Sequence, residues 1–583
     1  MSEYLKSINS PADLKRLSLE QLPELAAEVR EALLTRLSAT GGHAGPNLGM
    51  VEATIAMHYV FNSPRDKFVF DVSHQCYVHK MLTGRKDGFT DPERYGAYSG
   101  YTNPGESEHD IFTVGHTATA ISLATGLAMA RDLKGGSENV VAIVGDGSMS
   151  GGEAFEGLNN ASTLGSNFIL LFNDNDIAIA PNHGGMYQNF AQLRETDGTA
   201  ECNFFKSFGM DYRYVADGND VLALVEAFRA VKDADYPVVI HIHTEKGKGL
   251  PWNKENMEGC HFVMPGLAPL DDFMTQYPSC GAIMADHLLE KIKADPTVMV
   301  LSPATPGQSM LLPEFREKAG MQFLDVGIAE QHAVAVASGL ARNGAKPVLC
   351  IVSSFMQRTY DQMLLDLSLD SSPAVILVSN AGINPGDATH CGIYDIAMTN
   401  SIPNLICLAP TTTEEYLAMF DWALERADAP VMIREPSMPI PAGHEVTFTP
   451  SDVGKYEIAE QGRKVALLGL GNFYHRAVQV KELLKEKTGI DATLINPRTW
   501  SALDERTLED LKVGHEVVVT LEDGVVTGGF GQRIASYYGP SAMKVLNYGA
   551  AKEFRDRMPA EEQYQRDRLT PEQITEDILR CVQ

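Results

Sequence analysis

The chain has 583 residues, of which 44% are hydrophobic and 21% are charged, and its formal net charge is −28. This length exceeds what one hydrophobic core supports, so we expect a globular protein of roughly three to four domains. The negative charge argues against a nucleic-acid partner and against an anionic membrane surface, and the lack of a signal core or of about 18 consecutive apolar residues predicts a cytoplasmic protein without a membrane span.

The first part of the chain alternates helix and strand patterns around three loops. Apolar residues at helical spacing predict an amphipathic helix before residue 40, with a buried stripe of Leu22, Leu25, Val29 and Leu33. The glycine-rich stretch 41–49 predicts an irregular loop, followed by an apolar helix at 51–60 and a buried strand at 68–72. Each of three loops presents one histidine, namely His43, His74 and His116. A lone histidine of this kind is more often structural, but three near predicted sheet edges are better interpreted as donors to an anionic cofactor and substrate.

Two apolar runs, residues 140–144 and 168–172, predict buried parallel strands joined by a helical crossover. The first run leads into a GDG turn and the second into an NDN turn. Because ligands bind beyond the carboxyl ends of parallel strands, Asp146 and Asn175 can share one ion. Together with a backbone carbonyl, which we assign to Ile177, they are hard ligands suited to Mg²⁺ or Ca²⁺, and Mg²⁺ commonly completes its octahedron with phosphates. An isolated GDG usually marks only a turn, whereas here its glycines would let the backbone approach a diphosphate.

The helix and strand alternation continues beyond this region. After a strand at 237–243, residues 252–279 predict a linker that carries His261, and the alternation restarts at residue 298. A short strand ending at Asp325 leads into a helix rich in small residues, 333–340, and strands at 348–352 and 374–378 lead into polar loops. Repeated prolines predict a second linker at 436–450. We therefore divide the chain into residues 1–279, 280–435 and 436–583.

Six motifs along the chain resemble one family. They are DVSHQCYVHKMLTGR (71–85), GHTATAIS (115–122), GDG with NDN, IAEQHA (328–333), SSFMQRTYDQ (353–362) and the loop with Asp387 and His390. The family is 1-deoxy-D-xylulose-5-phosphate synthase, in the transketolase superfamily. The resemblance implies an α/β protein of three doubly wound domains with a thiamine-diphosphate-binding, transketolase-like fold, assembled as a homodimer. It also implies an enzyme that uses thiamine diphosphate and Mg²⁺ to condense pyruvate with glyceraldehyde 3-phosphate, releasing CO₂.

The resemblance assigns a role to each candidate residue. Glu330 resembles the glutamate that hydrogen-bonds a pyrimidine nitrogen of the cofactor, a task suited to a carboxyl group whose pKa is raised in a dry site. The other catalytic candidates are His43, His261, Asp387 and His390. The cofactor-binding candidates are Glu330, His74, His116, Gly145, Gly147, Ser148, Asn175, Ile177, Arg358 and Phe355, which would stack on the pyrimidine ring, and the metal ligands are Asp146, Asn175 and Ile177.

The acceptor end of the chain departs from the family pattern. Where the family carries arginines that hold the acceptor phosphate, this chain has Asn380 and Ser437. Arg434, about one turn earlier, is the candidate that would partly replace them. Val352 stands where a tyrosine is common, and the segment 182–202 is shorter than is usual, which leaves open how the site is covered. The acceptor and the pathway served (isoprenoid, thiamine or pyridoxal precursor supply) therefore stay open.

Other functions compete with this interpretation. A transketolase-like enzyme acting on a ketose phosphate, or a pyruvate carboligase with a different or unphosphorylated aldehyde acceptor, would use the same cofactor. A binding or regulatory protein that kept the fold would not need Asp146, Asn175 and Glu330 together. A nicotinamide-dependent dehydrogenase rests only on the GLG at 469–471, because the third glycine of the dinucleotide fingerprint would fall at Tyr474.

Overall fold

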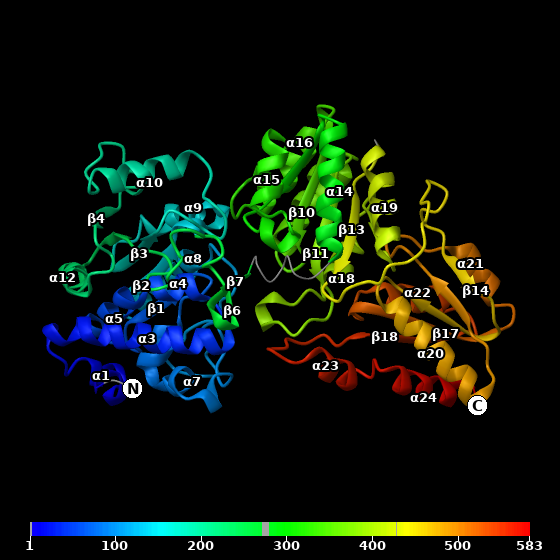
Figure 1. The fold of residues 1–583 in the computed structure, drawn as a ribbon, viewed down its shortest axis with the longest axis horizontal. Coiled ribbons are helices and arrows are strands. Elements are labelled where there is room, and N and C mark those ends of the chain that lie inside the picture. Colours follow the sequence, from blue (N-terminus) through cyan, green and yellow to red (C-terminus); the bar gives the residue numbers. More distant parts are fainter. Residues whose placement is uncertain (1–2, 271–278, 427, 583) are drawn as a thin grey trace. The chain divides into compact units, whose positions relative to one another are not determined.

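A computed structural model describes residues 3–270, 279–426 and 428–582 of the protein. It contains three sheets of five or six strands, in which every strand is parallel to its neighbours except one edge strand. The first sheet belongs to one compact unit, and the second and third sheets belong to another. Figure 1 shows the helices that flank each sheet. The predicted α/β class with three doubly wound domains is thus confirmed, while the proposed boundaries between the domains stay a prediction.

The first sheet has the strand order β1-β2-β3-β5-β4, and all of its strands are parallel. Its strands are β1 (Lys67–Phe70), β2 (Val140–Gly145), β3 (Phe168–Asp174), β4 (Asp211–Val215) and β5 (Pro237–His243). The helices that pack on it are α3 (Leu22–Thr40), α5 (Val51–Val60), α8 (Ala120–Leu133), α9 (Gly152–Ala161) and α12 (Val221–Val231). As predicted, α9 forms the crossover between two buried parallel strands.

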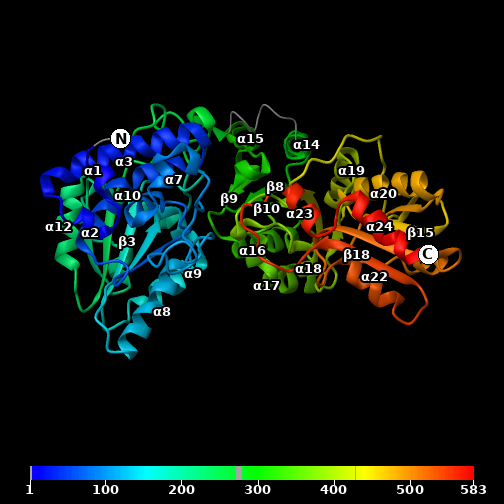
Figure 2. The ribbon, with the colours of Figure 1, turned by 90° about the horizontal axis from the view of Figure 1, so that it is seen from below.

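Alternate residues of β2 enter two different cores, and this makes the first unit doubly wound. Val141 and Ile143 join the core formed with α3, α5 and α12, whereas Val140, Ala142 and Val144 join the core formed with α8 and α9. Because side chains of a strand alternate between its two faces, an uninterrupted apolar run requires helices on both sides. Figure 2 shows β3 between α3 on one side and α8 and α9 on the other.

The second sheet has the order β12-β13-β11-β10-β8-β9 and is also parallel. Its strands are β8 (Val298–Ser302), β9 (Phe323–Asp325), β10 (Lys346–Val352), β11 (Val375–Ala381), β12 (Ile406–Leu408) and β13 (Val431–Pro436). One face packs against α14 (Cys280–Ala294) and α19 (Thr413–Glu425). The other face packs against α16 (Glu330–Arg342) and shares its core with the third sheet through Trp500 and Phe530.

The third sheet has the order β14-β16-β15-β17-β18, with β14 antiparallel at its edge. Its strands are β14 (Glu457–Glu460), β15 (Lys464–Gly469), β16 (Thr493–Asn496), β17 (His515–Val525) and β18 (Lys544–Ala550). The main helices around it are α20 (Phe473–Thr488), α22 (Phe530–Tyr538) and α24 (Pro571–Val582). In the described part of the chain, no helix is both long and apolar enough to cross a membrane.

Two local predictions need correction. The stretch 41–49 was expected to be an irregular loop, but Ala44–Gly49 form the short helix α4. Its glycines serve close packing, because a Cβ on Gly45 would lie 2.8 Å from the carbonyl oxygen of Cys260. The predicted linker 252–279 also contains structure in its described part, where β6 (Val263–Met264) pairs with β7 (Ala268–Pro269), while residues 271–278 lie outside the described residues.

Candidate active site

The predicted metal ligands lie at the carboxyl ends of two neighbouring strands. Gly145 of β2 pairs with Asn173 of β3, so Asp146 and Asn175 follow directly at the same edge of the sheet. The Asp146 side chain is only 2% exposed, and one of its carboxylate oxygens accepts a hydrogen bond of 2.8 Å from the Asn182 amide. The side-chain oxygen of Asn175 is buried and has no hydrogen-bond partner. A buried polar atom without a hydrogen-bond partner indicates a binding position for a ligand, and an amide oxygen is a suitable ligand for a hard cation.

The electrostatics at this edge also fit a cation. Burial, and secondly the nearby Asp174, raises the pKa of Asp146 to about 7, while Lys246 opposes the shift. Lys246 itself is held on the carbonyl of Ala178. A buried carboxylate is stable in its charged form only beside a positive charge. Among the described residues, no three His, Cys, Asp or Glu side chains are grouped to hold a metal. The predicted metal ligands are not a group of this kind, because two of the three are an amide oxygen and a backbone carbonyl.

The two glycines of the GDG turn lie in different surroundings. A Cβ on Gly147 would lie 2.5 Å from the Cβ of Ala178, so close packing alone requires glycine there. A Cβ on Gly145 would meet nothing within 4 Å, so this residue faces open space at the end of β2. Ser148 and Ile177 are both buried next to these turns. Of the two glycines, only Gly145 therefore leaves open space that a diphosphate could fill.

A series of hydrogen bonds holds the NDN turn through the carboxylates of Asp174 and Asp176. Arg194 donates to both carboxylate oxygens of Asp174 at 2.8 Å and to Asp176 at 2.7 Å. His241 contacts the Asp174 carboxylate at 2.9 Å, and the Tyr212 hydroxyl contacts the other ring nitrogen of His241 at 2.7 Å. Burial alone would raise the pKa of Asp174, but these bonds hold it below its usual value. The residue beside Asn175 is thus held as an anion.

The shortened segment after the NDN turn contacts both turns. Its helix α10 (Gly185–Glu195) carries Tyr187 and Arg194, which lie seven positions apart and hence on the same face. The Tyr187 hydroxyl donates to the Asp146 carbonyl at 3.1 Å, and Asn182 precedes the helix. We call Asn182, Tyr187 and Arg194 the strap residues. No local sequence pattern indicates their role, because their partners are recognisable only once the fold is known.

Three histidines from distant segments form one cluster. The ring centroids of His43 and His74 are 5.1 Å apart, and His261 lies 5.6 Å from the first and 5.2 Å from the second. Gly42 and Val263 exchange two backbone hydrogen bonds of 2.9 Å, which bring His261 beside His43. Burial holds the pKa of His261 well below its usual value, and its Nδ1 is buried without a hydrogen-bond partner. His261 is therefore a neutral imidazole at neutral pH.

Asp71 ties two of the predicted loops together. Its carboxylate accepts the backbone N–H groups of Ala118 at 2.9 Å and Ala120 at 3.0 Å, at the start of α8. His116 lies just before these residues, and His74 lies three residues after Asp71. A carboxylate at a helix N-terminus satisfies orphan N–H groups there. Asp71 is a further site residue that was not predicted, although it stands first in the DVSH motif.

The remaining candidates belong to the second unit. Glu330 occupies the first turn of α16 and is 3% exposed. Burial raises its pKa, and Arg358, whose guanidinium lies 3.6 Å from Oε2, opposes the rise. The ring of Phe355 meets that of His390 edge-on, with centroids 5.6 Å apart. Asp387 begins the turn that carries His390.

Arg434 cannot serve as the replacement phosphate ligand that the sequence allowed. It is 2% exposed, and its Nε donates to the Asp395 carboxylate at 2.6 Å. Another guanidinium nitrogen donates to the backbone carbonyl of Asp523, also at 2.6 Å. These bonds link β13 to α18 (Asp395–Thr399) and β17. Arg434 is therefore a structural ion-pair residue.

The two positions that replace family arginines are bonded to neutral groups. The Asn380 amide donates to the side-chain oxygen of Gln308 at 3.3 Å. The Ser437 hydroxyl donates to the carbonyl of Ala381 at 3.2 Å. Neither position supplies a positive charge.

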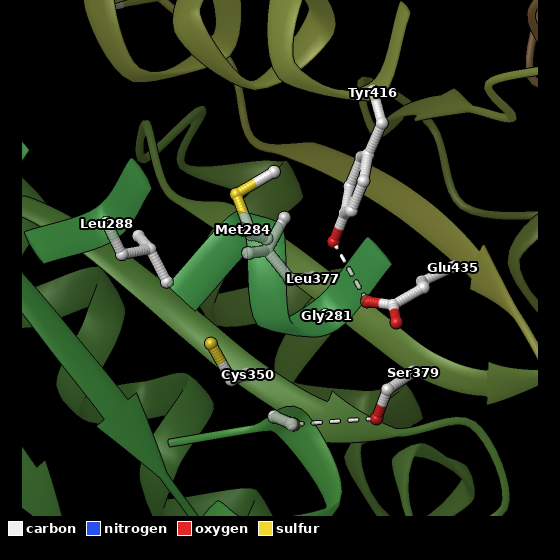
Figure 3. A pocket seen from close by; sticks show the side chains of 9 residues that line it. Gly281, Met284, Leu288, Cys350, Leu377, Ser379, Tyr416 and Glu435 are labelled. Atoms are coloured by element: carbon white, nitrogen blue, oxygen red, sulfur yellow. Dashed lines mark hydrogen bonds between the residues drawn. The ribbon is translucent and has the colours of Figure 1, made fainter. Parts of the chain in front are cut away.

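A pocket lined by residues of α14, α19, β10, β11 and β13 includes Ser379 and Glu435, which stand close to these two positions in the sequence (Figure 3). The Tyr416 hydroxyl donates to the Glu435 carboxylate at 3.1 Å, and burial raises the pKa of Glu435 to about 7. None of the nine lining residues is lysine or arginine: Gly281, Met284, Leu288, Ser309, Cys350, Leu377, Ser379, Tyr416 and Glu435. This pocket is unsuited to a phosphate.

Comparisons with known proteins agree with the motifs. The family model described as 1-deoxy-D-xylulose-5-phosphate synthase matches residues 5–203. The family model of the transketolase pyrimidine binding domain matches residues 277–441, and that of the transketolase C-terminal domain matches residues 454–574. A 1-deoxy-D-xylulose-5-phosphate synthase of Symbiobacterium thermophilum is 35% identical, over 98% of this chain and 94% of that protein. One of Natranaerobius thermophilus is 37% identical, over 92% and 91%. The chain belongs to the 1-deoxy-D-xylulose-5-phosphate synthase family.

As a member of this synthase family, the protein is a thiamine-diphosphate-dependent transferase. Among solved structures, a transketolase from Campylobacter jejuni covers 97% of this chain and 100% of its own at 16% identity and a TM-score of 0.46. The predicted recognition of the family and of the enzyme class is confirmed. The individual roles of the site residues stay predictions.

Proposed function

We propose that the protein decarboxylates pyruvate and ligates the two-carbon unit to glyceraldehyde 3-phosphate, giving 1-deoxy-D-xylulose 5-phosphate and CO₂. We further propose that it works with Mg²⁺, as a cytoplasmic homodimer, and supplies isoprenoid and thiamine precursors. Membership of the synthase family supports the reaction. The observation that carries the metal is the buried, unpartnered Asn175 oxygen beside the buried Asp146 carboxylate.

Asp146, Asn175 and the carbonyl of Ile177 would hold the Mg²⁺, and Gly145, which faces open space, would leave room for the diphosphate. When bound, thiamine diphosphate supplies an electron sink for breaking the bond between the carboxyl and carbonyl carbons of pyruvate. The chain's own residues then have to orient the reactants and move protons. Asp174, held as an anion by Arg194, keeps the NDN turn in place for this task.

Glu330 is placed to hold a proton inside a dry site. Its raised pKa keeps the carboxyl group protonated to a higher pH than an exposed glutamate. A protonated carboxyl can donate to a ring nitrogen of the cofactor pyrimidine, and this is the role that the family resemblance gives it. Arg358, 3.6 Å away, limits the rise in pKa, so the proton can still leave.

The histidine cluster supports hydrogen bonding to the substrate oxygens. His261 is neutral and can either donate or accept, and His43 and His74 lie within one ring contact of it. Neutral imidazoles stabilise a developing alkoxide without adding a charge that a dry site would resist. In the second unit, Asp387 and His390 are the proposed contacts to donor and acceptor.

One incubation tests the proposal. The protein is mixed with carbon-labelled pyruvate, thiamine diphosphate, Mg²⁺ and a panel of aldehydes, and both the gas and the sugar products are identified. Release of labelled CO₂ with formation of 1-deoxy-D-xylulose 5-phosphate is expected. Product from a ketose phosphate without CO₂ release would favour a transketolase-like enzyme instead.

A second candidate function differs only in its acceptor. It is a pyruvate carboligase that takes an unphosphorylated aldehyde, and the buried ion pair of Arg434 with Asp395 favours it. The acid pocket with Glu435 and Tyr416 adds no positive charge at this edge. The same panel separates the two functions, because it contains both phosphorylated and unphosphorylated aldehydes.

A further inference from the structure

The side chain of Asn47 joins the backbones of two cluster histidines. Asn47 lies on α4 and is completely buried. Its Nδ2 donates to the carbonyl of His43 and to the carbonyl of His74, each at 2.7 Å, while its Oδ1 accepts the N–H of Tyr77 at 2.9 Å. An amide nitrogen has two hydrogens, and both are used here. One side chain therefore sets the separation of two segments that the sequence keeps apart.

The segment that Asn47 holds has a strained backbone. Val72 and Ser73, directly before His74, have φ angles of 58° and 67°. Positive φ is a genuine outlier for a β-branched residue, and such strain persists only where the surroundings fix it. Ser73 is held by its hydroxyl, which donates to the Val114 carbonyl at 2.8 Å. The Asn47 bond fixes the other end of this turn, at His74.

The two backbone segments that Asn47 joins carry rings that contact each other. His43 and His74 meet edge-on, with centroids 5.1 Å apart and planes at 88°. Both also contact the ring of His261. A displacement of about 1 Å at a reacting group costs about 10²-fold in rate. Loss of the Asn47 side chain would remove one hydrogen bond from each of these carbonyls and allow a displacement of this kind.

We propose that Asn47 is a positioning residue for the histidine cluster, fixing the distance between the His43 and His74 rings. The proposed positioning of the two rings can be tested in the apoprotein. Only its expected effect on catalysis rests on the proposed function. The sequence motif GPNLG gives no hint of this role, because the partners of Asn47 are backbone carbonyls.

Two substitutions test the proposal. Asn47→Ala removes all three hydrogen bonds, whereas Asn47→Asp keeps the size of the side chain and an acceptor for the Tyr77 N–H but removes both donors. We expect kcat to fall about 10²-fold in each, with the KM for pyruvate and the Kd for thiamine diphosphate changed by less than about threefold. If the Asn47→Ala variant does not fold, the Asn47→Asp variant alone tests the proposal.

Asn139→Ala is the matched control. Asn139 is 2% exposed in the same unit, and its amide donates to Asp66 and Asp233 at 3.1 and 3.0 Å. It lies directly before β2, at the amino edge of the sheet and away from the turns of the site. Its loss should lower thermal stability and leave the turnover of the folded enzyme near that of the parent.

Resonances of the histidine rings give a readout that needs no activity. In the apoprotein with selectively labelled histidine, His43→Gln and His74→Gln identify the two signals. Both signals should shift in the Asn47 variants and stay in place in Asn139→Ala. Unshifted signals, or a loss of kcat no larger than that of the control, would overturn the proposal. Shifted signals in a protein that makes no product would instead refute the proposed function and leave the positioning role intact.

Discussion

The predicted cation site of the first unit and the acceptor end of the second unit differ in how their charges are used. In the first unit, Arg194 holds Asp174 as an anion next to Asn175, and Asp146 is buried close by. In the second unit, Arg434 is buried and bonded to the Asp395 carboxylate and the Asp523 carbonyl. Its charge is neutralised inside the protein.

This difference shows that a charged residue must be judged by its partners. Arg194 and Arg434 are both tied to aspartates, but the first pair fixes a turn of the site, whereas the second joins strands and a helix of the core. The predicted cofactor end therefore has buried oxygens that suit a cation, whereas the predicted acceptor end has no free positive charge at Asn380, Ser437 or Arg434.

Asp146→Ala and Asn175→Ala should each abolish Mg²⁺-dependent binding of thiamine diphosphate. Each removes one of three protein oxygens from a site whose octahedral geometry tolerates little distortion. Calorimetry with and without Mg²⁺ measures the effect. Asp66→Ala is the control, because this buried aspartate bonds to Asn139 at the other edge of the same sheet. Unchanged cofactor affinity in both site variants would remove the metal from these residues.

Glu330→Ala should lower kcat by about 10²–10⁴, the usual scale of a positioned proton-transfer group. Cofactor binding should stay within about tenfold, because the residue acts in activation more than in anchoring. The measurement is turnover together with the exchange rate of the cofactor's thiazolium proton. Glu522→Gln serves as control: this buried glutamate accepts the N–H groups of Phe530 and Gly531 at the start of α22. Exchange at the parent rate in Glu330→Ala would assign the role to another residue.

The fold could be predicted because apolar runs and their spacing are local signals. The strands 140–144 and 168–172 and the helix at 51–60 lie where the pattern put them. Helix α4 was not predicted because its glycines are required by contacts with residues far away in the sequence, such as the contact of Gly45 with the carbonyl of Cys260. A glycine needed for close packing has the same sequence signal as a glycine needed for a loop.

Histidines 43, 74 and 261 could be named from the sequence through the family resemblance, and their rings lie together in the structure, while their roles stay predictions. The site could not be predicted beyond such named residues. It could not be predicted where the partner is a backbone carbonyl or lies far along the chain. Asn47 bonds to carbonyls, and Arg434 bonds to groups 39 and 89 positions away. A single sequence contains no local pattern from which such pairs can be recognised.

The acceptor end should discriminate weakly for phosphate. Each charge-assisted hydrogen bond to a phosphate contributes about 1.5–3 kcal/mol, so two missing arginines forgo roughly 3–6 kcal/mol, or about 10²–10⁴ in affinity. The structure now removes Arg434 as a substitute. The measurement is the ratio of kcat/KM for glyceraldehyde 3-phosphate to that for glyceraldehyde, in the parent and in Asn380→Arg/Ser437→Arg. A parent ratio above about 10⁴, not raised by the double substitution, would reveal another phosphate site.

The smallest expected effect concerns the strap residues. It tests whether their hydrogen bonds contribute to binding at the cofactor end. Tyr187→Phe removes one hydroxyl, which donates to the Asp146 carbonyl at 3.1 Å and to the Gly147 carbonyl at 3.4 Å. A neutral hydrogen bond contributes about 0.5–1.5 kcal/mol, so the Kd for Mg²⁺ and thiamine diphosphate should rise about 2–10-fold. Arg194→Met removes a charged partner of the NDN turn and should weaken binding more, by about 10–100-fold, as for other residues that orient metal ligands.

Two matched variants separate this effect from a general loss of stability. The Tyr59 hydroxyl donates to the Leu17 carbonyl at 3.0 Å, in the N-terminal helices of the same unit. Arg131 is 3% exposed and bonds to the carbonyls of Glu138 and Asn167, at the amino edge of the sheet. Tyr59→Phe and Arg131→Met should lower the unfolding temperature without changing the Kd. If the strap variants matched these controls in both quantities, residues 182–195 would only stabilise the fold, and the two ends of the enzyme would differ less than their hydrogen bonds indicate.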